Sequence, residues 1–231
     1  MKKILKIDTS ARALDNETAS YRSLSRQLAA HFQQQWLEHN ESDNFIHRDV
    51  GATPPGFVSQ NWIAGVFTPE EKRNKEQQAL LSLSEQLIAE VAMADLILIS
   101  TPMYNYGMPA SLKAWFDQVV RVNKTFTFDL ARGDFPLQPV FSGKTLVLLT
   151  SSGEFGFGPG GIRESMNHLG PHIRTLSHYL GVENFYEIGI EYQEFGDERH
   201  QRSIENAYRA VDQLVVRLST VDSEPVASTG A

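Results

Sequence analysis

Three segments of the chain carry hydroxyl, amide and aromatic side chains at places where a small ligand can bind. They span residues 9–25, 101–106 and 151–161. Each begins where an apolar or alternating run typical of a β-strand ends. In an open α/β sheet, ligands bind at the carboxyl ends of the strands. We therefore predict a small-molecule site built from these segments, with residues 101–106 as its floor.

The first segment combines hydroxyl groups with the start of a predicted helix. The helix is expected from Ser20 onward, so Ser23 and Ser25 lie at or just inside its first turn. Unpaired backbone N–H groups and the positive end of the helix dipole suit an anion such as phosphate. The segment has no Walker lysine pattern, which disfavours a nucleoside triphosphate. Simple capping by the two serines explains the spacing equally well.

The second segment offers a methionine, two tyrosines and an asparagine amide to a ligand. Flat aromatic ligands need such an apolar surface, with polar groups at the edge of the ring, although an ordinary turn before a helix would contain the same residues. In the third segment, residues 156–161 match G-x-G-x-x-G. The match lies several residues beyond its strand and contains Pro159, so we interpret it as a mobile or ligand-shaped loop and not as a dinucleotide fingerprint.

Other catalytic signatures are missing from the sequence. Neither G-x-S-x-G nor H-E-x-x-H occurs, and the absence of cysteine excludes disulfides, thiolate metal sites and cysteine nucleophiles. His168 and His172 have i, i+4 spacing, but the Gly170-Pro171 pair between them would break the helix that aligns them. We therefore predict no metal site.

Composition narrows the class of protein further. The 231 residues carry a formal net charge of −7, and without a basic tract neither nucleic acid nor an anionic membrane is an expected partner. No apolar run approaches the length of a membrane span. The apolar stretch near the start is short and interrupted by Lys6 and Asp8, which is unlike a signal peptide. A soluble, cytoplasmic protein is expected.

Strand and helix patterns alternate along the chain. Strands are predicted at residues 2–8, 45–50, 96–100, 144–150 and 185–190. Helices are predicted from residue 20, from residue 68, and over residues 109–121, 172–180 and 203–218. The second helix is expected to begin at the capping sequence Thr68-Pro69-Glu70-Glu71 and to bury Leu80, Leu83, Leu87 and Val91. Residues 53–67 and 125–139 are read as long connectors.

This alternation predicts an α/β fold, a doubly wound parallel sheet of about five strands with helices on both faces. Residues 1–218 are expected to form one domain, followed by a disordered polar tail at residues 219–231.

The run from Thr101 to Asp117 closely resembles the signature of the FMN-dependent NADH:azoreductases, also called FMN-dependent NADH:quinone oxidoreductases. Ser10 and the Ser23-Leu24-Ser25 run resemble the phosphate-binding serines of that family. The resemblance covers residues 1–218 and implies a flavodoxin-like fold and a homodimer with two FMN sites at the subunit interface. It also implies a ping-pong reaction, in which NADH or NADPH reduces FMN and the flavin then passes two electrons to a quinone or azo compound.

The resemblance also implies roles for individual residues. The expected cofactor contacts are Ser10, Ser23, Leu24 and Ser25 at the phosphate, Pro102, Met103, Tyr104, Asn105 and Tyr106 at the ring, and Ser151, Ser152, Gly153 and Glu154 at its other edge. Phe128 either stacks on the substrate, across the dimer, or packs within its own loop. Ser20 is an alternative to Ser23 at the phosphate, and Glu154 replaces a family glycine, which adds a charge near the flavin edge.

Two other functions stay open at this point. A flavodoxin-type electron carrier would hold FMN without a substrate pocket, but the two long aromatic connectors argue against an exposed flavin edge. A flavin-free protein that binds a partner is the other alternative, because a fold does not determine a function.

Overall fold

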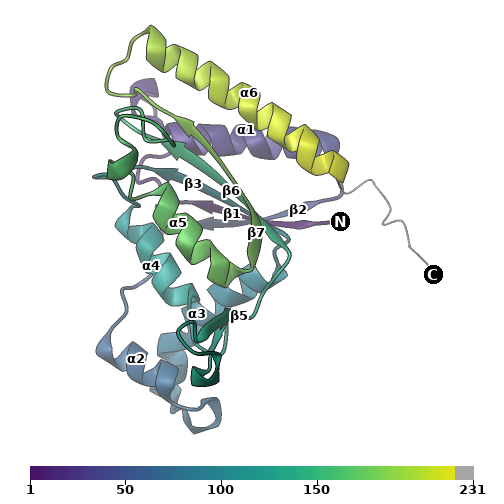
Figure 1. Cartoon of the computed structure of the whole chain (residues 1–231), viewed down its shortest axis with the longest axis vertical. Helices are drawn as coiled ribbons and strands as arrows, with labels where there is room; N and C mark the ends of the chain where they lie inside the picture. Colours follow the sequence, from purple (N-terminus) through teal and green to yellow (C-terminus); the bar gives the residue numbers. More distant parts are fainter. Residues whose placement is uncertain (222–231) are drawn as a thin grey trace, which may run out of the picture.

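The computed structural model describes residues 1–221 of the chain. Its centre is a parallel sheet of five strands in the order β2-β1-β3-β6-β7 (Figure 1). The strands are β1 Lys3–Asp8, β2 Asn44–Asp49, β3 Leu96–Pro102, β6 Lys144–Ser151 and β7 Val182–Ile190. Every residue of β3 is buried, as expected for an apolar run at the middle of a parallel sheet. The predicted flavodoxin-like, doubly wound sheet is confirmed.

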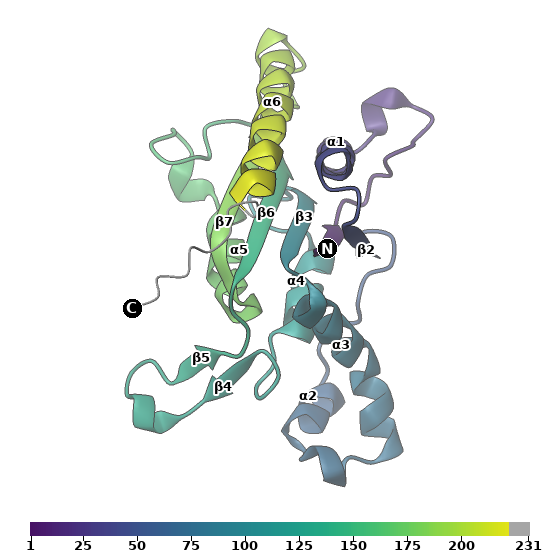
Figure 2. The same cartoon turned by 90° about the vertical axis from the view of Figure 1, so that its right-hand side faces the viewer.

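Helices cover both faces of the sheet (Figures 1 and 2). Two helices, α1 Leu24–His39 and α6 Glu198–Val221, lie side by side on one face, where they enclose a core that contains Phe32 and Trp36. The other face carries α3 Lys75–Met93, α4 Ala110–Val119 and α5 Gly170–Ser177, around a core that contains Trp115 and Phe116. Within residues 1–221, no helix has the length and apolarity needed to cross a membrane.

The two connectors are more structured than the sequence suggests. The first contains α2 Gln60–Phe67, and the second contains the antiparallel pair β4 Phe126–Phe128 and β5 Leu137–Pro139. Figure 2 shows α2 and this hairpin at the same end of the molecule, away from α6. Each is therefore a small appendage on the sheet and its helices.

The predicted helix start at Thr68 is wrong. Thr68 ends α2, because its backbone N–H and its hydroxyl both donate to the carbonyl of Ala64, at 3.0 and 2.7 Å. The next long helix, α3, begins at Lys75 behind a capping box made by Asn74 and Gln77. Its buried stripe contains Leu81, which lies against Gly65 of α2, whereas Leu80 is 38 % exposed.

Smaller differences occur at the other helix ends. Before α1 there is a single 3₁₀ turn, Ala19–Tyr21, and the helix itself starts at Leu24. Gly181 ends the α5 segment in the left-handed conformation, with φ 81°, as predicted. The last helix, α6, continues to Val221, and Asn40 donates to the hydroxyl of Ser219. Residues 219–221 are thus helical, and the rest of the predicted tail lies outside the described residues.

Candidate functional site

The chain makes a sharp backbone bend directly after β3. Tyr104 and Gly107 exchange two backbone hydrogen bonds of 2.9 and 3.0 Å, and the two residues between them have positive φ angles, 48° at Asn105 and 66° at Tyr106. This is the pattern of a type I′ turn. Asparagine tolerates the left-handed region, but a tyrosine there is strained, and such strain gathers at binding sites.

Neighbouring segments hold this bend in place. The N–H of Met103 donates to Ser151 O at 2.8 Å, and the N–H of His168 donates to Tyr106 O at 2.9 Å. The hydroxyl of Tyr106 donates to the Glu154 carboxylate at 3.1 Å. Residues from the ends of β3 and β6 are therefore tied together at one edge of the sheet.

The start of α1 presents hydroxyl groups at the same edge. Ser23 is the N-cap, and its Oγ accepts from Arg26 N at 3.3 Å and lies 3.2 Å from Ser25 Oγ. The Oγ of Ser10, which follows β1, accepts from Arg12 N at 3.1 Å. Two buried serines thus adjoin the unpaired N–H groups of a sixteen-residue helix, an arrangement that suits an anion.

A cavity of about 130 Å³ joins these two features. The lining residues predicted from the sequence are Ser10, Ser23, Leu24, Pro102, Met103, Tyr104, Ser151 and Gly153. They come from the carboxyl ends of β1, β3 and β6 and from the start of α1. The structure therefore brings parts of all three predicted segments to one place.

The other predicted residues lie around this cavity and not in its wall. Ser25 is fully buried, and Asn105 and Tyr106 form the tip of the bend. Ser152 lines a second, larger cavity. Ser20 belongs to the exposed 3₁₀ turn, so Ser23 is the better placed of the two alternatives. Phe128, 53 % exposed on the hairpin, lines neither of these two cavities.

Glu154 has two partners in the structure. Its carboxylate accepts from Tyr106 and forms a 2.9 Å ion pair with Arg163. Arg163 in turn lies over the ring of Phe155, with 4.7 Å between the guanidinium carbon and the ring centroid. The charge of Glu154 is therefore compensated, and its carboxylate joins the bend to the third segment.

Four lining residues were missed by the sequence analysis: Arg12, Arg22, Gln193 and Glu194. The two arginines lie in the first segment, and their charge beside a helix N-terminus is a readable signal for an anion site. Gln193 and Glu194 follow β7, and the rule that ligands bind at the carboxyl ends of strands would have included that loop as well.

The loop after β7 pairs with the third segment. The N–H groups of Tyr192, Gln193 and Glu194 donate to the carbonyls of Glu154, Ser152 and Gly153, at 3.0 to 3.2 Å. A Cβ atom added at Gly153 would lie 2.6 Å from the Cγ of Glu194. Glycine at position 153 therefore lets the Glu194 side chain lie directly against the backbone of the cavity wall.

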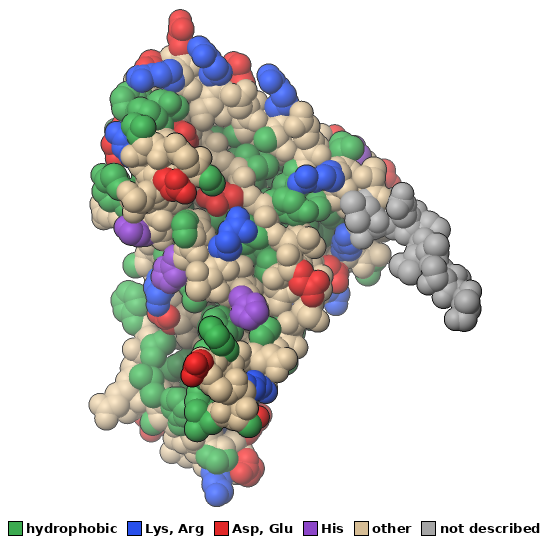
Figure 3. Space-filling view, viewed as in Figure 1, with side chains coloured by type: hydrophobic (Ala, Val, Ile, Leu, Met, Phe, Trp, Pro, Cys, Tyr) green, Lys and Arg blue, Asp and Glu red, His purple; other side chains and the backbone are tan. Residues whose placement is uncertain are grey.

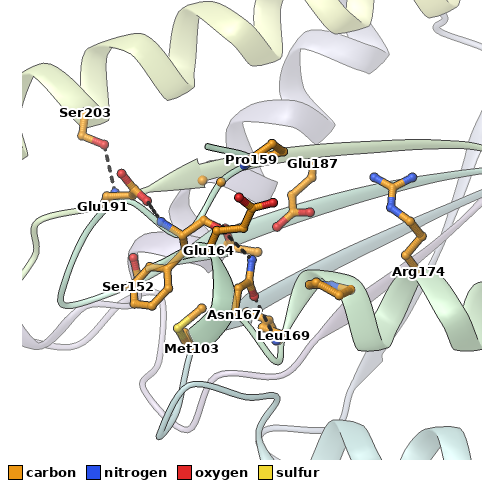
Figure 4. Close-up of a pocket in the computed structure, with 15 residues that line it drawn as sticks. Met103, Ser152, Pro159, Glu164, Asn167, Leu169, Arg174, Glu187, Glu191 and Ser203 are labelled. Atoms are coloured by element: carbon orange, nitrogen blue, oxygen red, sulfur yellow. Dashed lines mark hydrogen bonds between the residues drawn. The ribbon is translucent and has the colours of Figure 1, made fainter. Parts of the chain in front are cut away.

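The larger cavity, of about 580 Å³, lies beside β7 between α5, α6 and the glycine-rich loop (Figure 4). Glu191 accepts from the N–H groups of Gly156 and Phe157, and Glu164 accepts from Gly160 N, so both carboxylates anchor that loop. Burial raises the pKa of the third carboxyl, Glu187, and the charge of Arg174 only partly opposes this. An excess of carboxylates makes this cavity unfavourable for a phosphate.

Within residues 1–221, no group of three or more histidine, aspartate or glutamate side chains could hold a metal ion. His168 precedes α5 and His172 lies inside it, so the two do not share a helix face.

Comparisons with known proteins identify relatives of the chain. A family model described as flavodoxin-like fold matches residues 2–215. The chain is 64 % identical to FMN-dependent NADH:quinone oxidoreductase 2 of Colwellia psychrerythraea, over 93 % of this chain and 98 % of that protein. It is 38 % identical to FMN-dependent NAD(P)H:quinone oxidoreductase 1 of Pseudomonas aeruginosa, over 86 % and 92 %.

Solved structures show the same fold at low sequence identity. The azoreductase of Bacillus anthracis strain Sterne superposes with a TM-score of 0.80 at 17 % identity, over 94 % of this chain and all of that one. An FMN-dependent NADH-azoreductase of the Ames Ancestor strain, solved in complex with FMN, superposes with a TM-score of 0.81 at 16 % identity, over 95 % and 100 %.

Proposed function

Because the chain belongs to the FMN-dependent NADH:quinone oxidoreductases, a family with the flavodoxin-like fold, we propose that it binds FMN in the small cavity and passes two electrons from NADH or NADPH to quinones and azo compounds. The observation that carries this proposal is the junction of an anion site with a bent, aromatic peptide at the end of β3. FMN has the matching chemistry, a phosphate at one end and a flat ring at the other.

The residues present fit the phosphate. Ser10 and Ser23 supply hydroxyl donors, the first turn of α1 supplies N–H groups, and Arg12 and Arg22 supply positive charge on the same cavity wall. Leu24 offers its backbone N–H from the first helical position. Ser25 supports this end from within, through its contact with the Ser23 hydroxyl.

The bend and the third segment fit the ring. Met103 and Tyr104 offer an apolar surface at the floor, with Pro102, Asn105 and Tyr106 fixing the path of the backbone. Ser151 and Gly153 also line the cavity and would offer polar groups to the heteroatoms of the ring. The backbone carbonyls of residues 151–154 are already paired with Met103 and with the loop after β7, which fixes this wall. When bound, FMN itself supplies the redox chemistry, accepting a hydride from the nicotinamide coenzyme and passing two electrons to the acceptor in ping-pong order.

The chain therefore has to bind and orient its ligands, and no protein nucleophile is required. The paired state of Glu154 keeps an isolated negative charge away from the ring edge. Backbone N–H donors placed at the edge of the ring where negative charge develops during reduction would assist the reaction.

A homodimer is the assembly that we propose. A cavity of about 130 Å³ is smaller than typical small-molecule sites, which span roughly 300 to 1,000 Å³. Tyr104 and Tyr106 are each 39 % exposed, so one chain leaves the ring side of the site open. A second copy of the chain, bringing an aromatic residue such as Phe128, would cover it.

Exposed apolar side chains support this assembly. Figure 3 shows hydrophobic side chains gathered at the end of the molecule that α2 and the hairpin form. Large apolar residues are exposed there: Phe57, Ile63, Phe67, Phe128, Leu130, Phe135 and Leu137. Apolar clusters of this kind mark interaction surfaces. A cytoplasmic location is part of the same proposal, because the nicotinamide coenzymes that donate the electrons are intracellular.

An absorption experiment tests the proposed function. Purified protein, freed of cofactor and titrated with FMN, should gain the visible spectrum of a bound flavin and lose it when NADH or NADPH is added without oxygen. A quinone should then restore the spectrum. Protein that binds no FMN, or that binds FMN without being reduced by either coenzyme, would contradict the proposal.

A further inference from the structure

Arg26 is a buried arginine that none of the assigned roles uses. It lies in the first turn of α1, and its side chain is only 8 % exposed. One guanidinium nitrogen, Nη2, donates to the backbone carbonyl of Ser10 at 2.7 Å and to Asp49 Oδ1 at 2.7 Å. The other, Nη1, donates to Asp49 Oδ2 at 2.6 Å. Arg26 thus connects α1, β2 and the loop that carries Ser10.

The end of β2 is folded tightly against this arginine. The N–H groups of Val50 and Gly51 donate to Asp8 O, at 2.9 and 3.1 Å, and Ala52 N donates to Asp49 Oδ1 at 2.8 Å. A Cβ atom on Gly51 would lie 2.2 Å from Ser10 O and 2.7 Å from Arg26 Nη2. Only glycine allows so close an approach, and the Ser10 carbonyl is therefore enclosed from two sides.

The fixed charges around Arg26 balance. Asp49 forms the bidentate pair with Arg26, while Asp8 lies 3.8 Å from Arg26 and 3.6 Å from Lys6. His47 Nε2 also lies 2.8 Å from Asp8 Oδ2, so two fixed cations and a histidine face the two carboxylates. Burial works against the charge of Arg26, but the hydrogen bonds and charges of Asp49 and Asp8 outweigh it and raise its pKa. The same partner lowers the pKa of Asp49 against the effect of its own burial.

This balance separates two possible roles for Arg26. An arginine that attracts an anion by its charge should keep that charge uncompensated and directed at the ligand. Every hydrogen bond that the guanidinium makes goes to Asp49 or to the Ser10 carbonyl, its buried Nε makes none, and Arg26 does not line the small cavity. The bonds are suited to holding the peptide of Ser10, whose hydroxyl lines the small cavity.

We propose that Arg26 is a positioning residue for the cofactor phosphate: clamped by Asp49, it fixes the Ser10 peptide relative to the N-terminus of α1, so that the hydroxyls of Ser10 and Ser23 are set for a phosphate before it binds. This inference rests on the proposed function. It adds that the Arg26–Asp49 pair determines selectivity for the phosphorylated flavin without touching it.

The test compares Arg26→Lys and Asp49→Asn in protein freed of cofactor, with dissociation constants measured for FMN and for riboflavin, which lacks the phosphate. Lysine keeps the charge but cannot bind Asp49 and Ser10 together through a planar fork. We expect Arg26→Lys to raise the dissociation constant of FMN by about tenfold or more, which corresponds to the loss of one charge-assisted hydrogen bond. The dissociation constant of riboflavin should change by less than about twofold. The matched control is Arg48→Lys: Arg48 lies next to Asp49 on β2, but its ion pair is with Glu90 of α3.

The two possible roles of Arg26 predict opposite changes in FMN affinity when Asp49 is replaced by asparagine. Positioning predicts weaker FMN binding, because the clamp is loosened. Direct attraction predicts tighter FMN binding, because the charge of Arg26 is released from its partner. The inference would be overturned by tighter FMN binding in Asp49→Asn, by unchanged FMN affinity in Arg26→Lys, or by equal losses of affinity for FMN and riboflavin in either variant. Wild-type protein that binds neither flavin would instead overturn the proposed function, and the inference with it.

Discussion

Replacing Ser23 by alanine removes a hydroxyl that has two roles, one in the stability of the fold and one in binding the cofactor phosphate. In the structure, Ser23 Oγ caps α1 by accepting from Arg26 N and also contacts the fully buried Ser25 hydroxyl. Loss of the cap costs about 1 kcal/mol, and loss of the second hydrogen bond costs about 1 kcal/mol more. In a domain of this size, the sum lowers the Tm of the cofactor-free protein by about 4–8 °C.

The second role of the Ser23 hydroxyl is to donate a hydrogen bond to the phosphate of FMN. A hydroxyl can accept from Arg26 N and still donate its own hydrogen to a phosphate oxygen. Such a charge-assisted bond is worth about 1.5–3 kcal/mol, which is about 10- to 150-fold in the dissociation constant of FMN. Riboflavin should lose little. Fluorescence titrations of both flavins, with melting curves of the cofactor-free protein, measure the two effects separately.

Two further variants isolate the causes. Ser59 caps α2 in the same way, because its hydroxyl accepts from Trp62 N at 3.2 Å, but Ser59 does not line the small cavity. Ser59→Ala should therefore lower stability without affecting FMN. Ser23→Gly should cap almost as well as serine yet lose the FMN contact. If Ser23→Ala weakens FMN and riboflavin equally, the assignment of the phosphate to the start of α1 is refuted.

Three other changes test the bend, the larger cavity and the hairpin. Tyr106→Gly removes about 1 kcal/mol of left-handed backbone strain along with the bond to Glu154; we expect a nearly unchanged Tm and a several-fold loss of FMN affinity, and intact binding in titrations would exclude the bend from the site. Glu187→Gln should raise the Tm more at pH 7 than at pH 4. The folded protein holds the pKa of Glu187 above its ordinary value of 4.5, so the carboxyl costs stability once the pH rises past both values and the buried group ionises. Equal gains at both pH values in melting curves would contradict this. Phe128→Ala should raise the KM for a quinone without changing FMN affinity, whereas unaltered steady-state kinetics would assign this side chain to packing of the hairpin.

Local patterns in the sequence were enough to predict the sheet and the bend after β3. The apolar run of β3 and its aromatic turn are both continuous in sequence, so a short window contains the whole signal. The helix start at Thr68 failed for a physical reason. A threonine hydroxyl can accept an N–H at a helix start or donate to a carbonyl at a helix end, and here it does the latter.

The features that the sequence did not reveal depend on long-range partners. The pair of Arg26 with Asp49 joins residues on different elements, and neither residue type signals the other. Likewise, Glu194 reaches the cavity because the loop after β7 hydrogen-bonds to the segment after β6. Such contacts follow from the folded sheet, so they become readable only once the strand order is known.

The bend at Asn105 and Tyr106 has a consequence for the lifetime of the holoprotein. Its backbone is already closed by its own hydrogen bonds, held at Tyr106 O by the N–H of His168 and, through Met103 N, tied to Ser151 before any ligand arrives. The entropy of ordering this peptide is therefore lost during folding and not at docking. A flavin can then dissociate and rebind without local unfolding. Protein freed of its cofactor should therefore regain full FMN binding when fresh cofactor is added, and a chemically modified flavin should exchange into the same binding site.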